Sequence, residues 1–348
     1  MSLALPFPRE ERTEPSARRS MLYRLLRLRE IQLVLAMAVV VLVSAMLHPD
    51  FLTSGNISFM LADSAVTAIL ATGQTLVVLG RGIDLSVAPI LGVAAIEVGF
   101  PAQNHNLNLG LALLLAIGIG IVLGIGNGLL VSWARIPPII ATLATLSVYG
   151  GFQFILAGGQ EVVNIPNAYD SLGNSDVVSG VPWVLLVAIG IAVLVALFLR
   201  QTNLGRSIYA VGNNADAAHR SGIAVRRVIF ITYVLSGLLA GIAGLVYLCH
   251  TGSADSTTGT DSNVELTSIA ATLIGGTTLT GGKGGVIGSV LGAIFLSVAL
   301  TAMVFARIPA IWEPAGVGGL ILLAMVTDRH SGTFTPRPRK RSSEASAP

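Results

Sequence analysis

The stretch GLALLLAIGIGIVLGIGNGLLVSW, residues 110–133, contains no charged side chain. A run of about 20 apolar residues is long enough for a helix to cross the hydrocarbon core of a bilayer. Within it Gly120, Gly124 and Gly128 recur every four residues, which places them on one helix face. Small residues at that spacing let the backbone of a second helix approach closely. The stretch therefore predicts a membrane-spanning helix whose glycine face contacts another helix.

The composition of the whole chain agrees with a membrane protein. Of its 348 residues 53% are hydrophobic and 11% are charged, and the mean hydropathy is +0.77. Soluble domains carry about 25% charged residues, so most of this protein's surface cannot face water. The single cysteine, Cys249, allows neither an internal disulfide nor a cysteine-based metal cluster.

Ten apolar stretches lie along the chain, at residues 31–47, 57–79, 87–100, 110–133, 137–156, 182–199, 229–250, 263–279, 285–305 and 311–326. The third and the eighth are short or interrupted by Gly, Pro or polar residues, so we expect them to be tilted or re-entrant. No small-residue cleavage site follows the first, so we expect a retained helix rather than a cleaved signal peptide. The sequence therefore predicts an all-α membrane protein with about ten transmembrane helices.

The basic residues predict the orientation of these helices. If the N-terminus is cytoplasmic and ten spans alternate, every one of the 21 Lys and Arg residues except Arg307 falls on the cytoplasmic side. A wrong helix count would scramble this asymmetry. We therefore predict a multi-pass protein of the bacterial plasma (inner) membrane with both termini cytoplasmic. Its predicted parts are a basic N-terminal segment (1–30), a transmembrane domain (31–327) and a disordered cytoplasmic tail (328–348).

The chain is not expected to be an enzyme, and no cofactor is expected. The only Gly-Lys pair, Gly282 and Lys283, lacks the first glycine and the Ser or Thr of a phosphate-binding loop. The longest internal cytoplasmic segment, about 200–228, is too short for an ATPase domain. Any energy source for this protein is therefore expected on another chain, or there is none.

Three polar or glycine-rich blocks interrupt the apolar background, and the first is GRGIDLSV, residues 80–87. A charged side chain at the centre of the bilayer costs about 2.5–3.5 kcal/mol, so its Arg and Asp should lie at the interface or be paired. Gly82 permits a tight turn, and Asp84 or Ser86 can cap the next helix. We interpret the block as a structural turn rather than a substrate contact.

The second block is GRSIYAVGNNADAAHRSGI, residues 205–223. Asn214 is a suitable helix N-cap and Gly222 a suitable terminator, so a short Ala-rich helix is predicted between them on the cytoplasmic face. From composition alone this element is either a docking element for a soluble partner or an ordinary surface loop.

The third block is GGTTLTGGKGG, residues 275–285, in which Gly276, Gly281 and Gly282 are interpreted as turn residues. It continues into Gly288 and Gly292, which repeat the four-residue spacing of a helix contact face. This block predicts packing rather than chemistry.

The order of these blocks resembles the permease subunits of ribose-type, simple-sugar ABC importers over about residues 30–327, and the second block is the most specific. The resemblance implies the fold of type II ABC importer permeases and a non-catalytic transport subunit in the lipid bilayer. Its implied partners are cytoplasmic ATPase subunits, a second permease subunit that is identical or homologous, and an extracytoplasmic solute-binding protein, with no nucleic acid. It also implies that the ATPase is contacted through Gly205, Arg206, Gly212, Asn213, Asn214, Ala217, Ala218, Ser221 and Gly222.

Two departures from the family's pattern bear on the solute. Ala88 and Pro89 stand where the family commonly has glycine, and RIPAIW at 307–312 replaces its usual Asn-Gly-Leu stretch. The latter is similar to the branch for rhamnose-like sugars and autoinducer-2. The substrate-contacting residues are not predicted, and permeases for nucleosides or branched-chain amino acids share the general design.

A secondary transporter is the alternative from another class. Such a protein needs buried ionisable residues for coupling. The predicted spans contain only Asp63, Glu97, Glu265 and Glu313, of which only Asp63 lies away from the outer ends.

Overall fold

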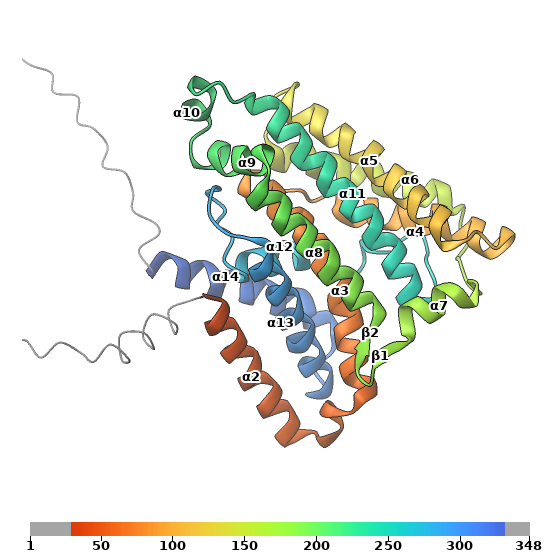
Figure 1. Ribbon diagram of the computed structural model, residues 1–348. Helices are drawn as coiled ribbons and strands as arrows, with labels where there is room; N and C mark the ends of the chain where they lie inside the picture. Colours follow the sequence, from red (N-terminus) through yellow and green to blue (C-terminus); the bar gives the residue numbers. More distant parts are fainter. Residues whose placement is uncertain (1–28, 331–348) are drawn as a thin grey trace, which may run out of the picture.

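The computed structural model describes residues 29–330, which are almost entirely helical. Within them seven helices are long and apolar enough to cross a membrane. They are α2 (Arg29–Leu47), α3 (Ser54–Leu79), α5 (Leu109–Ser132), α6 (Pro138–Ala157), α8 (Trp183–Gln201), α11 (Val225–Thr251) and α13 (Val286–Phe305). Figure 1 shows them as a bundle with α3 inside it.

The other three predicted spans are also helical, but they are not both long and apolar enough to count as crossing helices. They are α4 (Val87–His105), α12 (Val264–Ile274) and α14 (Glu313–His330). With 11 residues α12 rises only about 16 Å, roughly half of a bilayer core. The prediction that the eighth stretch is short is confirmed, whereas a count of ten crossing helices is not.

The remaining elements connect these helices. They are η1 (Pro49–Leu52), α7 (Asn167–Asn174), the antiparallel pair β1 (Asp176–Val178) and β2 (Val181–Pro182), α9 (Asn203–Asn213), α10 (Ala215–Arg220) and η2 (Ala310–Trp312). The predicted segment 1–30 lies outside the described residues except for its last two positions, which begin α2. The predicted tail also lies outside them, except that 328–330 complete α14.

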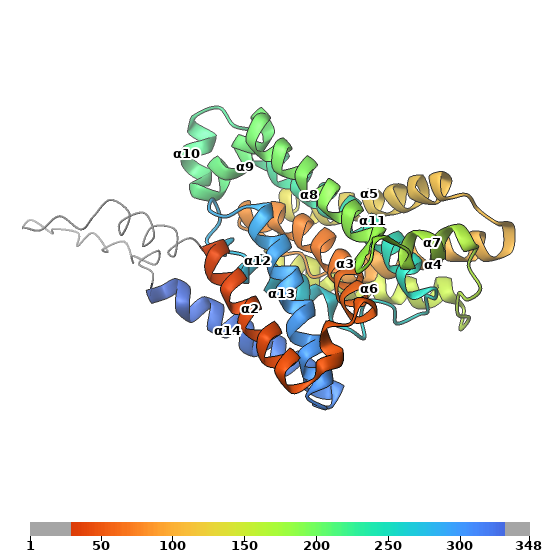
Figure 2. The ribbon, with the colours of Figure 1, turned by 60° about the horizontal axis from the view of Figure 1, so that its bottom comes forward.

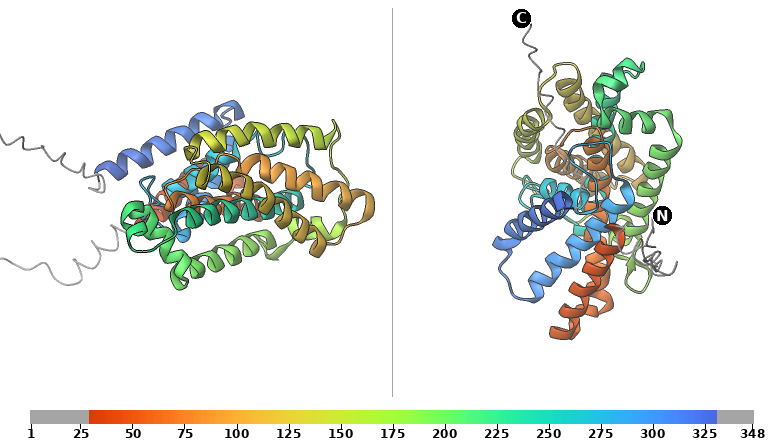
Figure 3. Two further views of the ribbon diagram at one scale, coloured as in Figure 1. Left: turned by 90° about the horizontal axis from the view of Figure 1, so that it is seen from above. Right: turned by 90° about the vertical axis from the view of Figure 1, so that its left-hand side faces the viewer.

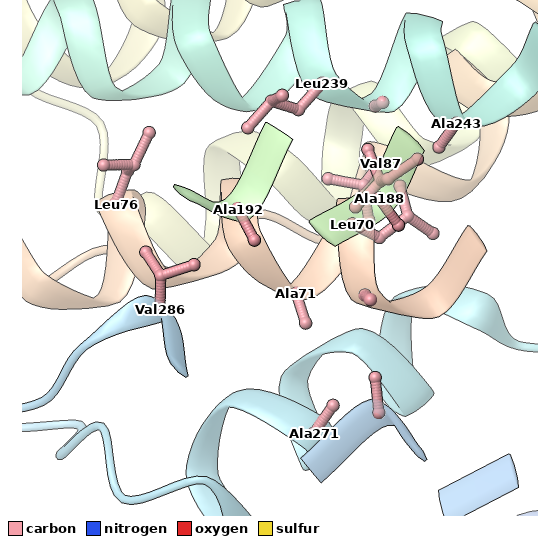
Figure 4. Packing of buried hydrophobic residues seen from close by; sticks show 14 of the residues in the cluster. Leu70, Ala71, Leu76, Val87, Ala188, Ala192, Leu239, Ala243, Ala271 and Val286 are labelled. Atoms are coloured by element: carbon pink, nitrogen blue, oxygen red, sulfur yellow. The ribbon is translucent and has the colours of Figure 1, made fainter. Parts of the chain in front are cut away.

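Helix α3 forms the centre of the protein, because 83% of the residues in its apolar 18-residue segment are buried. It packs against α8, α11, α12 and α13. Figure 4 shows small residues on both sides of α3, where Ala71 faces Ala271 and where Ala188 and Ala243 lie on the opposite side of the helix. Lipid is as apolar as these side chains, so close contact between small residues, rather than exclusion of water, stabilises this core.

The glycine face predicted for residues 110–133 packs against α11. A Cβ atom on Gly120 would lie 2.2 Å from the carbonyl oxygen of Gly237, and one on Gly237 would lie 2.3 Å from that of Gly120. A Cβ on Gly241 would lie 2.1 Å from the carbonyl oxygen of Ala116, and one on Gly124 would lie 2.8 Å from that of Tyr233. The predicted contact faces are therefore confirmed, and α5 and α11 run side by side (Figure 1).

The outer surface of the bundle is apolar. In helix α2 only 11% of the residues in its apolar 18-residue segment are buried. Helices α5, α6, α8 and α14 also lie at the outside of the bundle (Figure 2). Exposed side chains on them include Leu42, Leu114, Ile155, Leu194 and Leu322. An exposed apolar surface of this extent indicates contact with lipid.

The loops form two distinct ends. Helices α9 and α10 lie at one end, and α7 lies at the other (Figure 3). The first turn of α2 and the last turn of α14 lie at the same end as α9 and α10 (Figure 3). Both ends of the described chain are thus on one side of the molecule.

Candidate functional site

The three sequence blocks, which are far apart in the chain, meet beside α9. Arg81 lies in the turn after α3 with a φ angle of 68°. Its Nε donates a hydrogen bond to the carbonyl of Thr280 (2.9 Å), and its Nη2 donates to that of Asn213 (2.8 Å). One side chain of the first block therefore joins the second and the third, and we call this contact region the junction.

Glycines allow the backbones of the junction to touch. A Cβ atom on Gly212 would lie 1.8 Å from the carbonyl oxygen of Leu79 and 2.5 Å from the nitrogen of Gly282. The Gly282 N–H donates to that same Leu79 carbonyl at 3.0 Å. Gly276, Gly281 and Gly282 have φ angles of 99°, 77° and 71°, in the region that favours glycine. These φ angles agree with their interpretation as turn residues.

Helix α9 is fixed at both ends. The Thr202 hydroxyl accepts a hydrogen bond from the Gly205 N–H (2.9 Å), and a Cβ on Gly205 would lie 2.5 Å from the backbone of Leu199. Further along, the Tyr209 hydroxyl donates to the carbonyl of Gly284 (3.1 Å). Arg206 is exposed and hydrogen-bonds the side chain of Asn203. Helix α9 therefore ties α8 to the third block.

The short helix predicted between Asn214 and Gly222 is present as α10. Asn214 Oδ1 accepts a hydrogen bond from the Ala217 N–H (3.0 Å), which caps its start. Gly222 has a φ of 82°, and its N–H donates to the carbonyl of His219 while that of Ile223 donates to Ala218, both at 3.0 Å. This pair of bonds is a Schellman motif. Both predicted caps are confirmed.

Helix α10 has an anchored face and a free face. Ala218 is buried and belongs to the main hydrophobic core, whereas Asp216, Ala217, His219 and Arg220 are exposed. The acidic residue lies in the first turn and the basic residues in the last, which suits the helix dipole. Of the residues expected to contact an ATPase, Ala217 is thus available to a partner and Ala218 is not.

Asp84 is paired by hydrogen bonds inside the bundle, which is one of the two places predicted for it. Its side chain is completely buried, and Oδ1 accepts from the N–H (3.1 Å) and the hydroxyl (2.7 Å) of Ser86, while Oδ2 accepts from the hydroxyl of Ser236 (2.9 Å). Ser86 stands at the N-cap of α4 but makes no side-chain cap bond. Of the two candidates for a cap, the Ser86 side chain therefore makes none, whereas Asp84 accepts the Ser86 N–H at the start of α4.

A chain of hydrogen bonds extends from Asp84 across the bundle. Asn127 of α5 donates to the Ser86 hydroxyl (2.6 Å), and Thr145 of α6 donates to Asn127 Oδ1 (2.7 Å). With its amide oriented to satisfy both groups, Gln74 of α3 pairs with the backbone N–H and carbonyl of Asp84. The hydrogen bonds around Asp84 therefore link five helices, α3, α4, α5, α6 and α11. Sequence analysis missed this network because each partner is an isolated polar residue within an apolar stretch.

A polar cavity of about 340 Å³ lies at the opposite end, between α3, α7 and the end of α11. Ser58, Asn174, Asp176 and His250 contribute its polar groups. Hydrogen bonds from the Ser58 hydroxyl and then the Gly180 N–H lower the pKa of Asp176. Within residues 29–330 no group of three or more His, Cys, Asp and Glu side chains could hold a metal ion.

Asp63, the candidate for ion coupling, directly follows Ala62 of α3, which lines this cavity. Its Oδ2 accepts a hydrogen bond from the hydroxyl of Ser297 on α13 (2.9 Å). The other three acidic residues of the spans lie on three different helices, with Glu97 within α4 and Glu265 and Glu313 in the first turns of α12 and α14. No chain of acidic groups therefore crosses the described part of the bundle.

Comparison with known proteins places these features in a family. Residues 56–326 match the family model described as "Branched-chain amino acid transport system / permease component". The Autoinducer 2 import system permease protein LsrC of Klebsiella pneumoniae is 39% identical over 306 residues, covering 87% of this chain and 86% of that protein. The protein of that name from Enterobacter sp. is 37% identical (87% of each chain), and that from Yersinia enterocolitica 34% (77% and 73%).

No solved structure matches the chain. The match nevertheless covers all three sequence blocks and every crossing helix except α2 and the first residues of α3. The resemblance noted from those blocks is therefore confirmed, and the chain belongs to the permease family that this model describes.

Proposed function

We propose that this chain is the membrane-spanning subunit of an ATP-driven importer and that it carries a small, sugar-like solute of the autoinducer-2 kind. The observation that carries the proposal is the similarity, along almost the whole chain, to permeases of autoinducer-2 import systems. The RIPAIW sequence at 307–312 supports the same branch. The chain itself is a transport component, and ATP is hydrolysed on a separate subunit.

The junction supplies a route by which an ATPase can move the membrane helices. Only Asn214 separates α10 from the end of α9, so a displacement of α10 also moves Gly212 and Asn213. Gly212 and Asn213 contact the turn after α3 and the loop before α13. Because backbones touch there, little motion is absorbed by side chains. We propose that this rigid contact converts ATPase closure into the alternating access of an importer.

In the proposed assembly α9 and α10 face the cytoplasm and contact an ATPase subunit, with both chain termini on the same side. The distribution of Arg and Lys supports this orientation, as does the position of both described chain ends at the same end of the molecule as α10. A second permease subunit completes the pathway. The α7 end, with its polar cavity, then faces an extracytoplasmic solute-binding protein.

Cysteine labelling tests this orientation. Cysteines at Asn104 and Ser171, both exposed at the α7 end, should react with an impermeant thiol reagent on intact cells, and one at the exposed Asp216 should react only after permeabilisation. The native Cys249 is completely buried, so background labelling should be low. Labelling of position 216 in intact cells would show that the protein has the opposite orientation.

Ala217→Glu tests the coupling role of α10. The side chain is exposed, so the fold should be unchanged, but a carboxylate would be buried without a partner if this face docks in an ATPase cleft. Such burial costs several kcal/mol. We expect the amount of ATPase that co-purifies with the permease to fall by at least about tenfold, together with uptake.

Two variants serve as controls for this experiment. Ala217→Ser changes the size only slightly, and Gln201→Glu adds a similar charge at an exposed position at the end of α8. Both should retain the ATPase. If Ala217→Glu also retains the ATPase and full uptake, α10 is an ordinary surface loop and the coupling proposal fails.

A further inference from the structure

A second cavity, of about 300 Å³, lies beside the junction at the α9–α10 end of the bundle. It is formed where the first turn of α2, the last turn of α8, α9 and the loop before α13 meet. Its charged and polar side chains are Arg29, Glu30, Arg200 and Tyr209. Two arginines against one glutamate leave this cavity with an excess of positive charge.

The two arginines come from different helices, and a hydrogen bond holds one of them in place. The Arg29 guanidinium donates a hydrogen bond to the carbonyl of Leu273 at 3.1 Å, which fixes it against the end of α12. Arg200 is close enough to Tyr209 that its charge limits the rise in the pKa of that phenol caused by burial. Tyr209 is in turn held by its hydrogen bond to Gly284. Arg29 and Tyr209 are therefore fixed in the wall of the cavity, and the exposed Arg200 lies beside Tyr209.

The backbone adds to the same positive potential. Helix α13 begins at Val286 after Gly285, which has no side chain to cap it, and both residues line the cavity together with Ile287 and Gly288. The first N–H groups of a helix have no partner within it and carry partial positive charge. Such an end adds to the attraction of the arginines for an anion.

The cavity opens next to surfaces that face lipid. Val34 and Leu35 on α2 and Leu194 and Leu197 on α8 are exposed apolar side chains within two turns of the residues that line the cavity. Ile287, 55% exposed, belongs to the cavity wall itself. An anion bound in this cavity would therefore lie next to apolar protein surface that extends toward the bilayer core. An acyl chain can contact that surface, whereas a free phosphate cannot.

We propose that this cavity binds the phosphodiester headgroup of an anionic phospholipid from the adjacent leaflet. Basic pockets between transmembrane helices are suited to such headgroups. The lipid would brace α2, α8 and the glycine loop that Tyr209 contacts, so the composition of the leaflet would affect the rigidity of the junction. The proposal depends on the bilayer and on this cavity, and it does not depend on which solute is carried.

Native mass spectrometry tests the proposal that this cavity binds an anionic lipid. The full chain is first reconstituted in nanodiscs that contain phosphatidylglycerol and phosphatidylcholine in equal amounts. We expect phosphatidylglycerol to be retained in preference to phosphatidylcholine. Arg200→Gln should weaken its retention about fivefold, since one basic group near an anionic lipid contributes about 1 kcal/mol. Arg135→Gln, which removes an exposed arginine outside the cavity, should have no effect.

A second variant addresses the chance that loss of an arginine disturbs the fold. Ile287→Asp places an acidic residue in the first turn of α13, where it favours the helix but repels an anion. It should lower phosphatidylglycerol retention with an unchanged melting temperature, whereas Ile287→Ala should not lower it. Equal losses in the Arg200 and Arg135 variants, or equal retention of both lipids by the native chain, would overturn the proposal. Displacement of the lipid by an equal concentration of glycerol phosphate would instead assign the site to a free phosphate.

Discussion

Gly212→Ala is expected to abolish uptake and to lower the melting temperature of the detergent-solubilised protein by several degrees. The added Cβ would lie 1.8 Å from the Leu79 carbonyl oxygen, and neither backbone can yield without separating α9 from the turn after α3. That separation would break the hydrogen bond between Gly282 and Leu79. Overpacking of this kind costs about 1–3 kcal/mol or more. Uptake should fall further than stability, because the contact that fails is the proposed route of coupling.

Gly190→Ala is the matched control. Gly190 lies on the outer side of α8, and a Cβ there would meet no atom within 4 Å. The substitution adds the same methyl group to a helix and should leave the melting temperature and uptake unchanged or slightly higher. If the two variants behave alike, the backbones at the junction are not in the close contact described above.

Asp84→Ala is expected to have the largest effect on stability. It would remove the acceptor from three donors, the Ser86 N–H and the hydroxyls of Ser86 and Ser236, in a completely buried position. A buried donor left unsatisfied costs about 1–3 kcal/mol, and a backbone N–H cannot rotate to another partner. We expect little folded protein in the membrane and a strongly lowered melting temperature.

Asp84→Asn separates this explanation from a role for the negative charge. The amide keeps an acceptor for Ser86 and places a donor near the Ser236 hydroxyl, which can accept, so stability should be largely retained. Asp170→Ala removes an exposed aspartate that bonds only its neighbour Asn174, and should change the free energy of unfolding by less than about 0.5 kcal/mol. Equal destabilisation by Asp84→Ala and Asp84→Asn would show that charge, not hydrogen bonding, stabilises this region.

The sequence by itself determined the features whose physical cause is local. Hydrophobicity over about 20 residues identifies helices in lipid, and the four-residue spacing of Gly120 and Gly124 identified the face that packs on α11. The caps of α10 at Asn214 and Gly222 were likewise predictable, because a cap depends on residues within one turn of it. Each of these signals is contained in a short window of the chain.

Only the tertiary structure decided which distant groups meet. The residues on either side of Asp84 in the sequence do not indicate its partner Ser236, 152 positions later. They also do not indicate the chain of hydrogen bonds to Asn127 and Thr145. The contact of Arg81 with Thr280 and Asn213 depends in the same way on helices that pack elsewhere. A buried polar group can be satisfied by any donor that the fold brings within about 3 Å, and that choice is made by the packing of whole helices. Local pattern therefore specified the helices, while their packing made three separate blocks into one junction.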